Sequence, residues 1–98
     1  MIVVRDIMRL KFGKAKDVKA LMKESKDFMT ADEVKKSRVL FDLVGPAYTM
    51  VIETTCTNLA EFESDMSKGF SDKRWQEWYQ RFIPLVEQSY REIFTIYE

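Results

Sequence analysis

The stretch that decides the fold runs from Arg38 to Thr55 and reads RVLFDLVGPAYTMVIETT. Gly45 and Pro46 separate two apolar runs, so the stretch predicts two strands joined by a turn. Side chains alternate across a strand, and this alternation gives the predicted hairpin two unlike sides. One side is apolar throughout and suits a core: Val39, Phe41, Leu43, Tyr48, Met50 and Ile52. The other side mixes charged and aliphatic residues: Arg38, Leu40, Asp42, Val44, Thr49, Val51 and Glu53.

The register of the hairpin follows from the same alternation. A slip by one residue would set apolar side chains opposite polar ones, so a turn centred on Gly45 and Pro46 is favoured. The predicted pairs are Val44 with Ala47, Asp42 with Thr49, Leu40 with Val51, and Arg38 with Glu53.

The N-terminal part of the chain predicts a strand followed by a helix. Residues 2–12 alternate between an apolar face that Asp6 interrupts (Val4, Met8, Leu10, Phe12) and a mixed face (Val3, Arg5, Ile7, Arg9, Lys11). After Gly13, apolar residues recur at helical spacing from Lys14 to Met29, which is typical of an amphipathic surface helix. Residues 30–33, TADE, have the spacing of a capping box and predict one short further turn before the hairpin.

The C-terminal part predicts helix followed by strand. A second capping box at residues 58–61 precedes one apolar stripe, interrupted near Gly69: Leu59, Phe62, Met66 and Phe70. Ser71 is the predicted cap of a restarted helix, and Pro84 should kink or end that helix because proline lacks an amide donor. The tail REIFTIYE, residues 91–98, predicts a last strand with Phe94 and Ile96 on the core side and Ile93, Thr95 and Tyr97 on the other.

The resulting order, βαββαβ, predicts an α+β sandwich of the ferredoxin-like kind. Such a sandwich has a four-stranded antiparallel sheet with both helices on one face. No repeat or linker interrupts the chain, so residues 1–98 are expected to form one domain. The first and third strands are neighbours in this topology, which places Arg5 and Arg9 near Thr49 and Glu53. The helices cover the apolar side and leave the second face bare.

The composition narrows the classes of function. Sixteen basic and sixteen acidic residues balance, without a long run of like charge, which argues against nucleic acid or an anionic membrane as a partner. No apolar run approaches the ~20 residues of a membrane span, and MIVVRDIMRL lacks the apolar centre of a signal peptide, so we expect a cytoplasmic protein. The chain has no histidine and one cysteine, so we expect neither metal nor other cofactor, and Cys56 is interpreted as a small apolar filler.

The bare face raises the question of what covers it. It combines Arg5, Arg9, Arg38, Asp42, Glu53 and Tyr97 with five aliphatic residues: Ile7, Leu40, Val44, Val51 and Ile93. On a monomer these aliphatic side chains would form a sizeable exposed patch, so we expect a homodimer in which a second sheet covers the patch. Enclosed side chains of this mixed kind suit a small-molecule pocket. The alternative is a solvated sheet face on which Arg38 and Glu53 form a cross-strand ion pair.

An aromatic cluster lies in the last predicted helix. Trp75, Trp78, Tyr79 and Phe82 recur at spacings of three and four, which favours packing of the helix against the sheet. The alternative is a ligand-stacking box, with Trp75 as a cavity wall if the helix tilts away near Gly69.

The element order and three segments together resemble the dimeric α/β barrel superfamily. The segments are LKFGKA (10–15), GPAYTMVIETT (45–55) and WYQRFIPLVEQSYREIFTIYE (78–98). Within the superfamily the chain is most similar to NIPSNAP-like proteins, with antibiotic-biosynthesis monooxygenases as relatives, although such families usually have proline where Phe12 stands. The resemblance implies a homodimer whose two sheets form a barrel, with a cavity in each protomer between the sheet and helices or loops. It implies no particular reaction, and haem-degrading relatives rely on a histidine that this chain lacks.

Two functions remain open at this point. One is a homodimer that binds a small, partly apolar organic ligand without catalysis, and the other is a cofactor-independent monooxygenase or isomerase acting on an aromatic or polyketide-like substrate. The candidate ligand-binding residues are Arg5, Arg9, Arg38, Asp42, Glu53, Trp75 and Tyr97. On the bare face Arg5, Arg9, Lys11 and Arg38 outnumber Asp42 and Glu53, which predicts an anionic or phenolate-like ligand whose oxygen is bonded by Arg9 or Tyr97. The alternative is that Arg5 and Lys11 point to water and Arg9 pairs with Glu53, which leaves no net bias.

Overall fold

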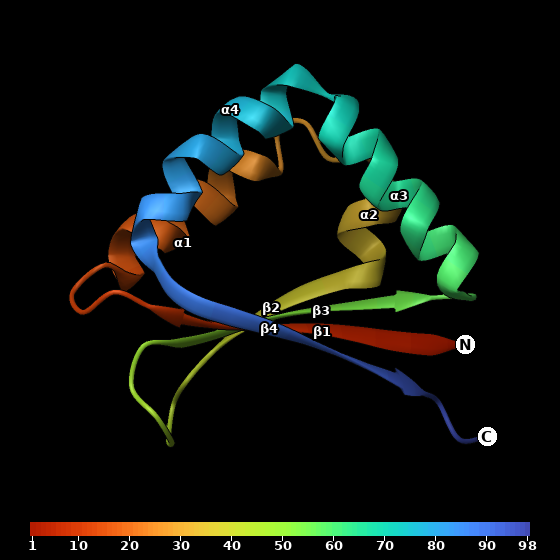
Figure 1. The fold of residues 1–98 in the computed structure, drawn as a ribbon, viewed down its shortest axis with the longest axis horizontal. Coiled ribbons are helices and arrows are strands. Elements are labelled where there is room, and N and C mark those ends of the chain that lie inside the picture. Colours follow the sequence, from red (N-terminus) through yellow and green to blue (C-terminus); the bar gives the residue numbers. More distant parts are fainter.

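The computed structural model describes residues 1–98 and consists of one sheet with all helices on one side (Figure 1). The strands are β1 (Ile2–Leu10), β2 (Ser37–Phe41), β3 (Thr49–Cys56) and β4 (Val86–Thr95). The helices are α1 (Ala15–Ser25), α2 (Ala31–Lys36), α3 (Leu59–Ser71) and α4 (Lys73–Phe82), followed by the 3-10 turn η1 (Ile83–Leu85). The predicted α+β class is confirmed, and α2 is the short turn expected after the capping box.

The sheet has the strand order β2-β3-β1-β4, and all neighbouring strands are antiparallel. The predicted central pairing of β1 with β3 is confirmed, because Arg5 lies opposite Glu53 and Arg9 opposite Thr49. The sheet is open, with β2 and β4 at its edges. The helices arch over one face, which we call the covered face, and leave the other, the open face, without a layer of its own (Figure 1).

The hairpin register is confirmed over the length of β2. Arg38 lies opposite Glu53 and Leu40 opposite Val51. Beyond the strand, the Asp42 backbone N–H donates to the carbonyl oxygen of Thr49 at 3.0 Å. The pairing of Asp42 with Thr49 is therefore also correct.

The centre of the covered face is a compact apolar core. Leu10 and Met50 of the sheet are almost completely buried, as are Val18 of α1 and Trp78 of α4. The indole Nε1–H of Trp78 donates to the carbonyl oxygen of Leu21 at 2.7 Å, so the one polar atom of this large side chain is satisfied. Full burial of an aliphatic or aromatic side chain of this size stabilises the fold by about 1.5 to 3 kcal/mol.

The predicted role of the aromatic cluster is confirmed for three of its four members. The rings of Trp75 and Trp78 meet edge to face with centroids 5.2 Å apart, and those of Trp78 and Phe82 stack at 4.9 Å. All three rings belong to or contact the core between α4 and the sheet. Tyr79 is half exposed and lies at the rim.

The last strand corrects the prediction in both position and facing. Pro84 lies in η1, so α4 ends at Phe82 and β4 begins at Val86, earlier than the predicted start at Arg91. Ile93 pairs with Val4 of the covered face, whereas Phe94 pairs with Val3 of the open face. Their predicted sides were therefore exchanged.

The physical reason for this facing is the acid that interrupts β1. Asp6 lies on the covered face, and its carboxylate accepts a hydrogen bond from Nε–H of Arg91 at 2.6 Å. The guanidinium of Arg91 also lies over the ring of Phe62 in α3, at 5.0 Å from the ring centroid. Turning Arg91 toward Asp6 fixes the alternation of the whole strand, because side chains alternate strictly along it.

The hairpin loop after Phe41 corrects a second prediction. Leu43 was predicted in the core, but it is 96% exposed, as is its neighbour Val44 at 95%. The strand ends at Phe41, and the loop bends away from the helices toward the side of the open face (Figure 1). Val44 and Ala47 consequently do not form a strand pair.

Two further apolar predictions were wrong. Phe12 was placed on the core face of the first strand, yet β1 ends at Leu10 and the Phe12 ring is 87% exposed. The predicted stripe on α3 is only half buried, since Leu59 and Phe70 are exposed and only Phe62 and Met66 are partly covered.

Helix α4 is capped by Asp72 instead of the predicted Ser71. The Asp72 carboxylate accepts a hydrogen bond from the Arg74 backbone N–H at 2.9 Å.

None of the helices combines the length and the apolar character that crossing a bilayer requires.

Candidate functional site

The open face carries an apolar patch that the chain itself leaves uncovered. Tyr90 and Phe94 are 57% and 46% exposed, and Leu40 is 36% exposed. Three further members lie on β1 and β3 and are half-buried: Val3, Ile7 and Val51. The predicted patch is thus present, with Tyr90 and Phe94 of β4 in the place expected for Ile93.

A shallow groove of about 480 Å³ crosses this face over β1, β3 and β4. It is lined by Arg5, Ile7, Met8, Arg9, Pro46, Thr49, Val51, Gln88, Tyr90 and Glu92. Apolar side chains alternate with groups that donate or accept hydrogen bonds, which is the composition of a site for a small, mostly apolar molecule. A smaller, wholly polar hollow of about 200 Å³ lies at the β2 edge and is lined by Lys35, Lys36, Ser37, Arg38, Glu53 and Thr55.

Glu53 lies between two arginines of the open face. Nε–H of Arg38 donates to its carboxylate at 2.9 Å, and Nε of Arg5 lies 3.4 Å from the other carboxylate oxygen. The Glu53 side chain is 17% exposed, against 68% for Arg38. The predicted Arg38–Glu53 pair is confirmed. The Nε atom of Arg5 is buried without a well-directed hydrogen bond, so this second contact is an ion pair only.

Arg9 and Glu92 are the remaining charged strand residues of the open face, and neither has an ion-pair partner in the chain. The neighbours of Arg9 across the sheet are the uncharged Thr49 and Gln88. The neighbour of Glu92 is Arg5, which is directed toward Glu53. Glu92 was not foreseen, and it reduces the predicted positive excess of this face to a single charge.

Of the seven predicted site residues, only Arg5 and Arg9 line the groove. Arg38 and Glu53 lie on the same face of the sheet and line the smaller polar hollow. The other three lie apart from both. The carboxylate of Asp42 accepts the Thr49 backbone N–H at 2.9 Å and braces the hairpin. Trp75 lies in the helical layer, where its ring meets the ring of Phe28 edge to face at 4.8 Å. Tyr97 follows the end of β4 and is 98% exposed. The structure therefore joins Arg5, Arg38 and Glu53 by ion pairs and places Arg9 in the groove beside Arg5, but it does not bring these three residues to them.

Sequence reasoning missed the contribution of β4 to the site. Gln88, Tyr90, Glu92 and Phe94 share one parity and lie on the open face. The available signal was Pro84, which limits α4 and leaves room for a strand that starts well before Arg91.

No group of three or more histidine, cysteine, aspartate or glutamate side chains is arranged to hold a metal ion.

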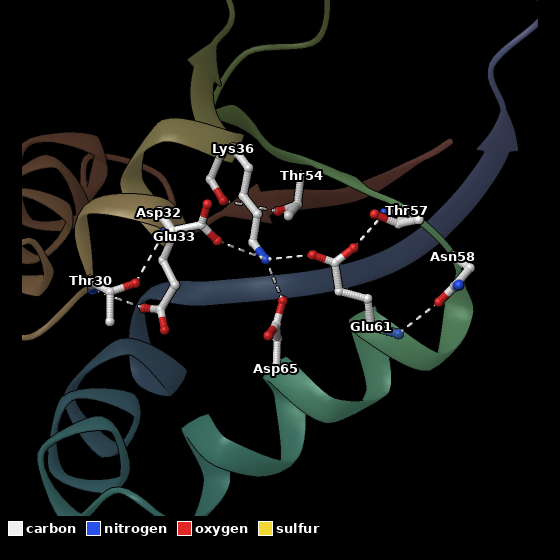
Figure 2. Close-up of polar contacts among 10 residues, drawn as sticks. Thr30, Asp32, Glu33, Lys36, Thr54, Thr57, Asn58, Glu61 and Asp65 are labelled. Atoms are coloured by element: carbon white, nitrogen blue, oxygen red, sulfur yellow. Dashed lines mark hydrogen bonds and ion pairs between the residues drawn. The ribbon is translucent and has the colours of Figure 1, made fainter.

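A separate polar cluster joins α2, α3 and β3 at the edge of the covered face. Lys36 points from the end of α2 toward three carboxylates, with Nζ at 2.6 Å from Asp65, 3.2 Å from Glu61 and 3.6 Å from Asp32 (Figure 2). Its side chain is 16% exposed. Hydrogen bonding to Asp65 and then to Glu61 raises the pKa of Lys36 well above its ordinary value.

Glu61 connects this cluster to the start of α3. Its carboxylate accepts the Thr57 backbone N–H at 2.5 Å, and its own backbone N–H donates to the Asn58 side chain at 3.0 Å (Figure 2). The hydrogen bond from Thr57, followed by that from Lys36, lowers the pKa of Glu61. These contacts hold the N-terminus of α3 against the end of β3, so the cluster is structural.

Cys56 ends β3 and is 1% exposed, which agrees with its interpretation as an apolar filler. Burial, and then the nearby charge of Glu61, raise the pKa of its thiol. A thiol with a raised pKa is a poor nucleophile at neutral pH.

The open four-stranded sheet with helices on one face places the chain among ferredoxin-like α+β proteins, and several solved structures share this fold. A NIPSNAP family protein from Agrobacterium tumefaciens superposes with a TM-score of 0.86 at 23% identity, over 96% of this chain and 90% of that chain. An uncharacterised NIPSNAP-like domain protein from Burkholderia xenovorans has a TM-score of 0.87 at 15% identity, over 98% and 84%.

A candidate antibiotic biosynthesis monooxygenase from Deinococcus radiodurans has a TM-score of 0.71 at 13% identity, over 100% of this chain and 94% of that chain. No protein-family model matches the chain, and no curated protein matches it in sequence. The three likenesses confirm the predicted resemblance at the level of the fold.

Proposed function

We propose that two copies of the chain associate through their open faces and bind a small, partly apolar organic molecule in the groove that becomes enclosed between the sheets. The observation that carries this proposal is the apolar patch around a mixed groove on a face without a covering layer. A chain of this length buries only about 60 to 65% of its unfolded surface, so further burial by association contributes strongly to stability.

The charges around Glu53 are compatible with being covered. Glu53 is already neutralised by Arg38 and Arg5 within the chain, so closing a second sheet over it leaves no isolated carboxylate there. Burial of an unpaired charge is costly, whereas a paired and hydrogen-bonded one is tolerated.

Arg9 is the group best placed to orient a ligand. It lines the groove, has no carboxylate partner in the chain, and carries five N–H donors in a rigid fork. Ile7, Val51 and Tyr90 supply apolar lining beside it. A molecule that is mostly apolar with one oxygen acceptor matches this arrangement. Arg5, Arg38 and Glu53 have a supporting role, because they hold one another in place.

A cofactor-independent monooxygenase or isomerase is the second candidate, favoured by the fold shared with the Deinococcus protein and by Arg9 beside Tyr90 in the groove. A guanidinium positioned at a developing oxyanion stabilises the anionic intermediates of such reactions. Oxygen consumption with an electron-rich phenol, lost in Arg9→Ala, separates this reading from simple binding.

The association is tested by light scattering at micromolar protein concentration, where a dimer mass is expected and a monomer mass would contradict the proposal. Binding is tested by thermal shift with benzoate, phenol and benzamide, which share a ring and differ in charge and hydrogen bonding. A ligand that binds only the folded state raises stability by mass action. The shift should disappear in Arg9→Ala, measured where this variant is still dimeric, and persist in the control Lys16→Ala on α1. Absence of any shift at millimolar ligand would contradict the binding part alone.

A further inference from the structure

The open face leaves two opposite charges without partners, and their positions are related in a particular way. Arg9 belongs to β1 and Glu92 to the neighbouring strand β4. Ile7 lies opposite Tyr90, and Arg9 and Glu92 lie two residues from this pair in opposite directions along the strands. Two residues of a strand span about 7 Å, so the two charges flank the Ile7–Tyr90 pair at nearly equal distances.

This arrangement is self-complementary under two-fold symmetry. In a symmetric dimer, if one residue contacts a second in the partner, the second contacts the first in return. Consider a two-fold axis that lies between the two facing sheets and runs across the strands at the level of Ile7 and Tyr90. This axis reverses the strand direction of the partner. Each Arg9 then comes to the level of the partner's Glu92, and each Glu92 to the level of the partner's Arg9. A two-fold axis along the strands would leave each charge at its own level, with no new opposite charge beside it.

We propose that Arg9 and Glu92 form two reciprocal ion pairs between subunits, and that these pairs set the two-fold axis at Ile7 and Tyr90. This inference rests on the proposed function, since it requires the open faces to meet. Packed sheets lie about 10 Å apart, a gap that an arginine and a glutamate extended toward each other can bridge. Complementary charges of this kind fix the register of an interface more than they add affinity.

The pairing also specifies the ligand more closely. Arg9 can donate to the partner's Glu92 with one edge of its guanidinium and to a ligand oxygen with another. The partner's carboxylate neutralises its charge, so the enclosed groove favours a neutral carbonyl or phenol oxygen over a carboxylate. Benzamide and phenol are therefore expected to stabilise the dimer more than benzoate does.

Charge reversal tests the pairing. Arg9→Glu and Glu92→Arg each create two like-charge contacts and should raise the dimer dissociation constant about a hundredfold or more, measured by sedimentation. The double variant R9E/E92R restores both pairs with inverted sign, so its dissociation constant should return to within about tenfold of the unmodified chain. Lys16→Glu and Glu63→Arg make the same charge changes on the exposed faces of α1 and α3 and should have no effect.

The outcomes separate this inference from the proposed function. A dimer that both single reversals leave intact, or that the double variant fails to restore while its far-ultraviolet circular dichroism is unchanged, overturns the reciprocal pairing but leaves association through the sheet. A monomer for the unmodified chain overturns both. Weakening by each single variant with recovery in the double variant establishes the pairing.

Discussion

The two faces of the sheet differ in how completely the rest of the chain covers them. On the covered face, Leu10 and Met50 are almost fully buried under α1 and α4. On the open face, side chains of similar size such as Leu40 and Phe94 keep more than a third of their surface exposed, next to arginines and glutamates. Apolar content alone therefore does not mark a core. The difference teaches that apolar side chains stay partly in water where no layer of the chain covers them, and the proposed association rests on this feature.

The largest expected effect comes from truncating one apolar side chain on each face. Leu10→Ala should lower the free energy of unfolding by about 3 kcal/mol, because it removes a fully buried side chain and leaves a cavity. Leu40→Ala should cost less than about 1 kcal/mol when the chain is measured as a monomer, since the site is partly in water. Urea unfolding at several protein concentrations checks both values. Equal costs at low concentration would abolish the distinction between the faces.

The edge of the covered face can be tested through Lys36. Replacing it by methionine keeps most of the volume but leaves the carboxylates of Asp65 and Glu61 without their cation. A hydrogen bond to a charged group contributes about 1.5 to 3 kcal/mol, so we expect a loss of about 2 kcal/mol in urea unfolding. Lys35→Met, next in the chain and without an ion pair, is the matched control and should change stability by less than about 0.5 kcal/mol. A similar effect for both variants would show that the cluster contributes nothing specific.

The contribution of the same cluster to folding stability should depend on pH in the acid range. The pKa of Glu61 is lowered in the folded chain from an ordinary 4.5, so its contribution to stability is present above that pH and is lost as the pH falls through the lowered pKa. Stability of the unmodified chain should therefore fall between about pH 4.5 and the lowered value, and Glu61→Gln should flatten that part of the profile. Glu63→Gln, which removes an exposed carboxylate of the same helix that pairs with no cation in the chain, is the matched control. Identical slopes in all three proteins would contradict the assignment.

The smallest expected effect belongs to the open face in isolation. The Arg38–Glu53 pair is half in solvent, and a double-mutant cycle on the monomer should give a coupling of about 0.2 to 1 kcal/mol. If a second sheet covers the pair, removing one partner should cost nearer 3 to 5 kcal/mol, so the cost should rise with protein concentration. A coupling that stays small at concentrations where light scattering shows a dimer would place this pair outside the interface.

The hairpin was predictable because its two sides differ in kind. Any slip would have mixed Val39 and Ile52 with Arg38 and Glu53, so one register was favoured and the structure has it. The facing of the last strand could not be predicted in this way, because Ile93 and Phe94 are adjacent and equally apolar. The side of each was decided by Asp6, which needs Arg91 on the covered face, a contact between residues 85 positions apart.

The candidate site was predictable only where it depended on strand register. The positions of Arg5, Arg9, Arg38 and Glu53 follow from the registers of β1, β2 and β3, and the structure places all four on the open face. Trp75 and Tyr97 depended on where a helix tilts and where a strand ends, which local pattern does not determine. The exposed part of the α3 stripe has the same cause, because helical periodicity identifies an apolar face but not the distance between that face and the sheet.

Because Cys56 is buried, the chain's only thiol can report on local opening of the structure. A thiol reagent can modify it only after the junction of β3 and α3 opens, because the side chain is enclosed and its thiolate is disfavoured in the folded state. The labelling rate therefore reports how often this junction opens, without any added probe. Opening that is local and opening that unfolds the whole chain respond differently to urea, so the urea dependence of this rate tells which of the two exposes Cys56.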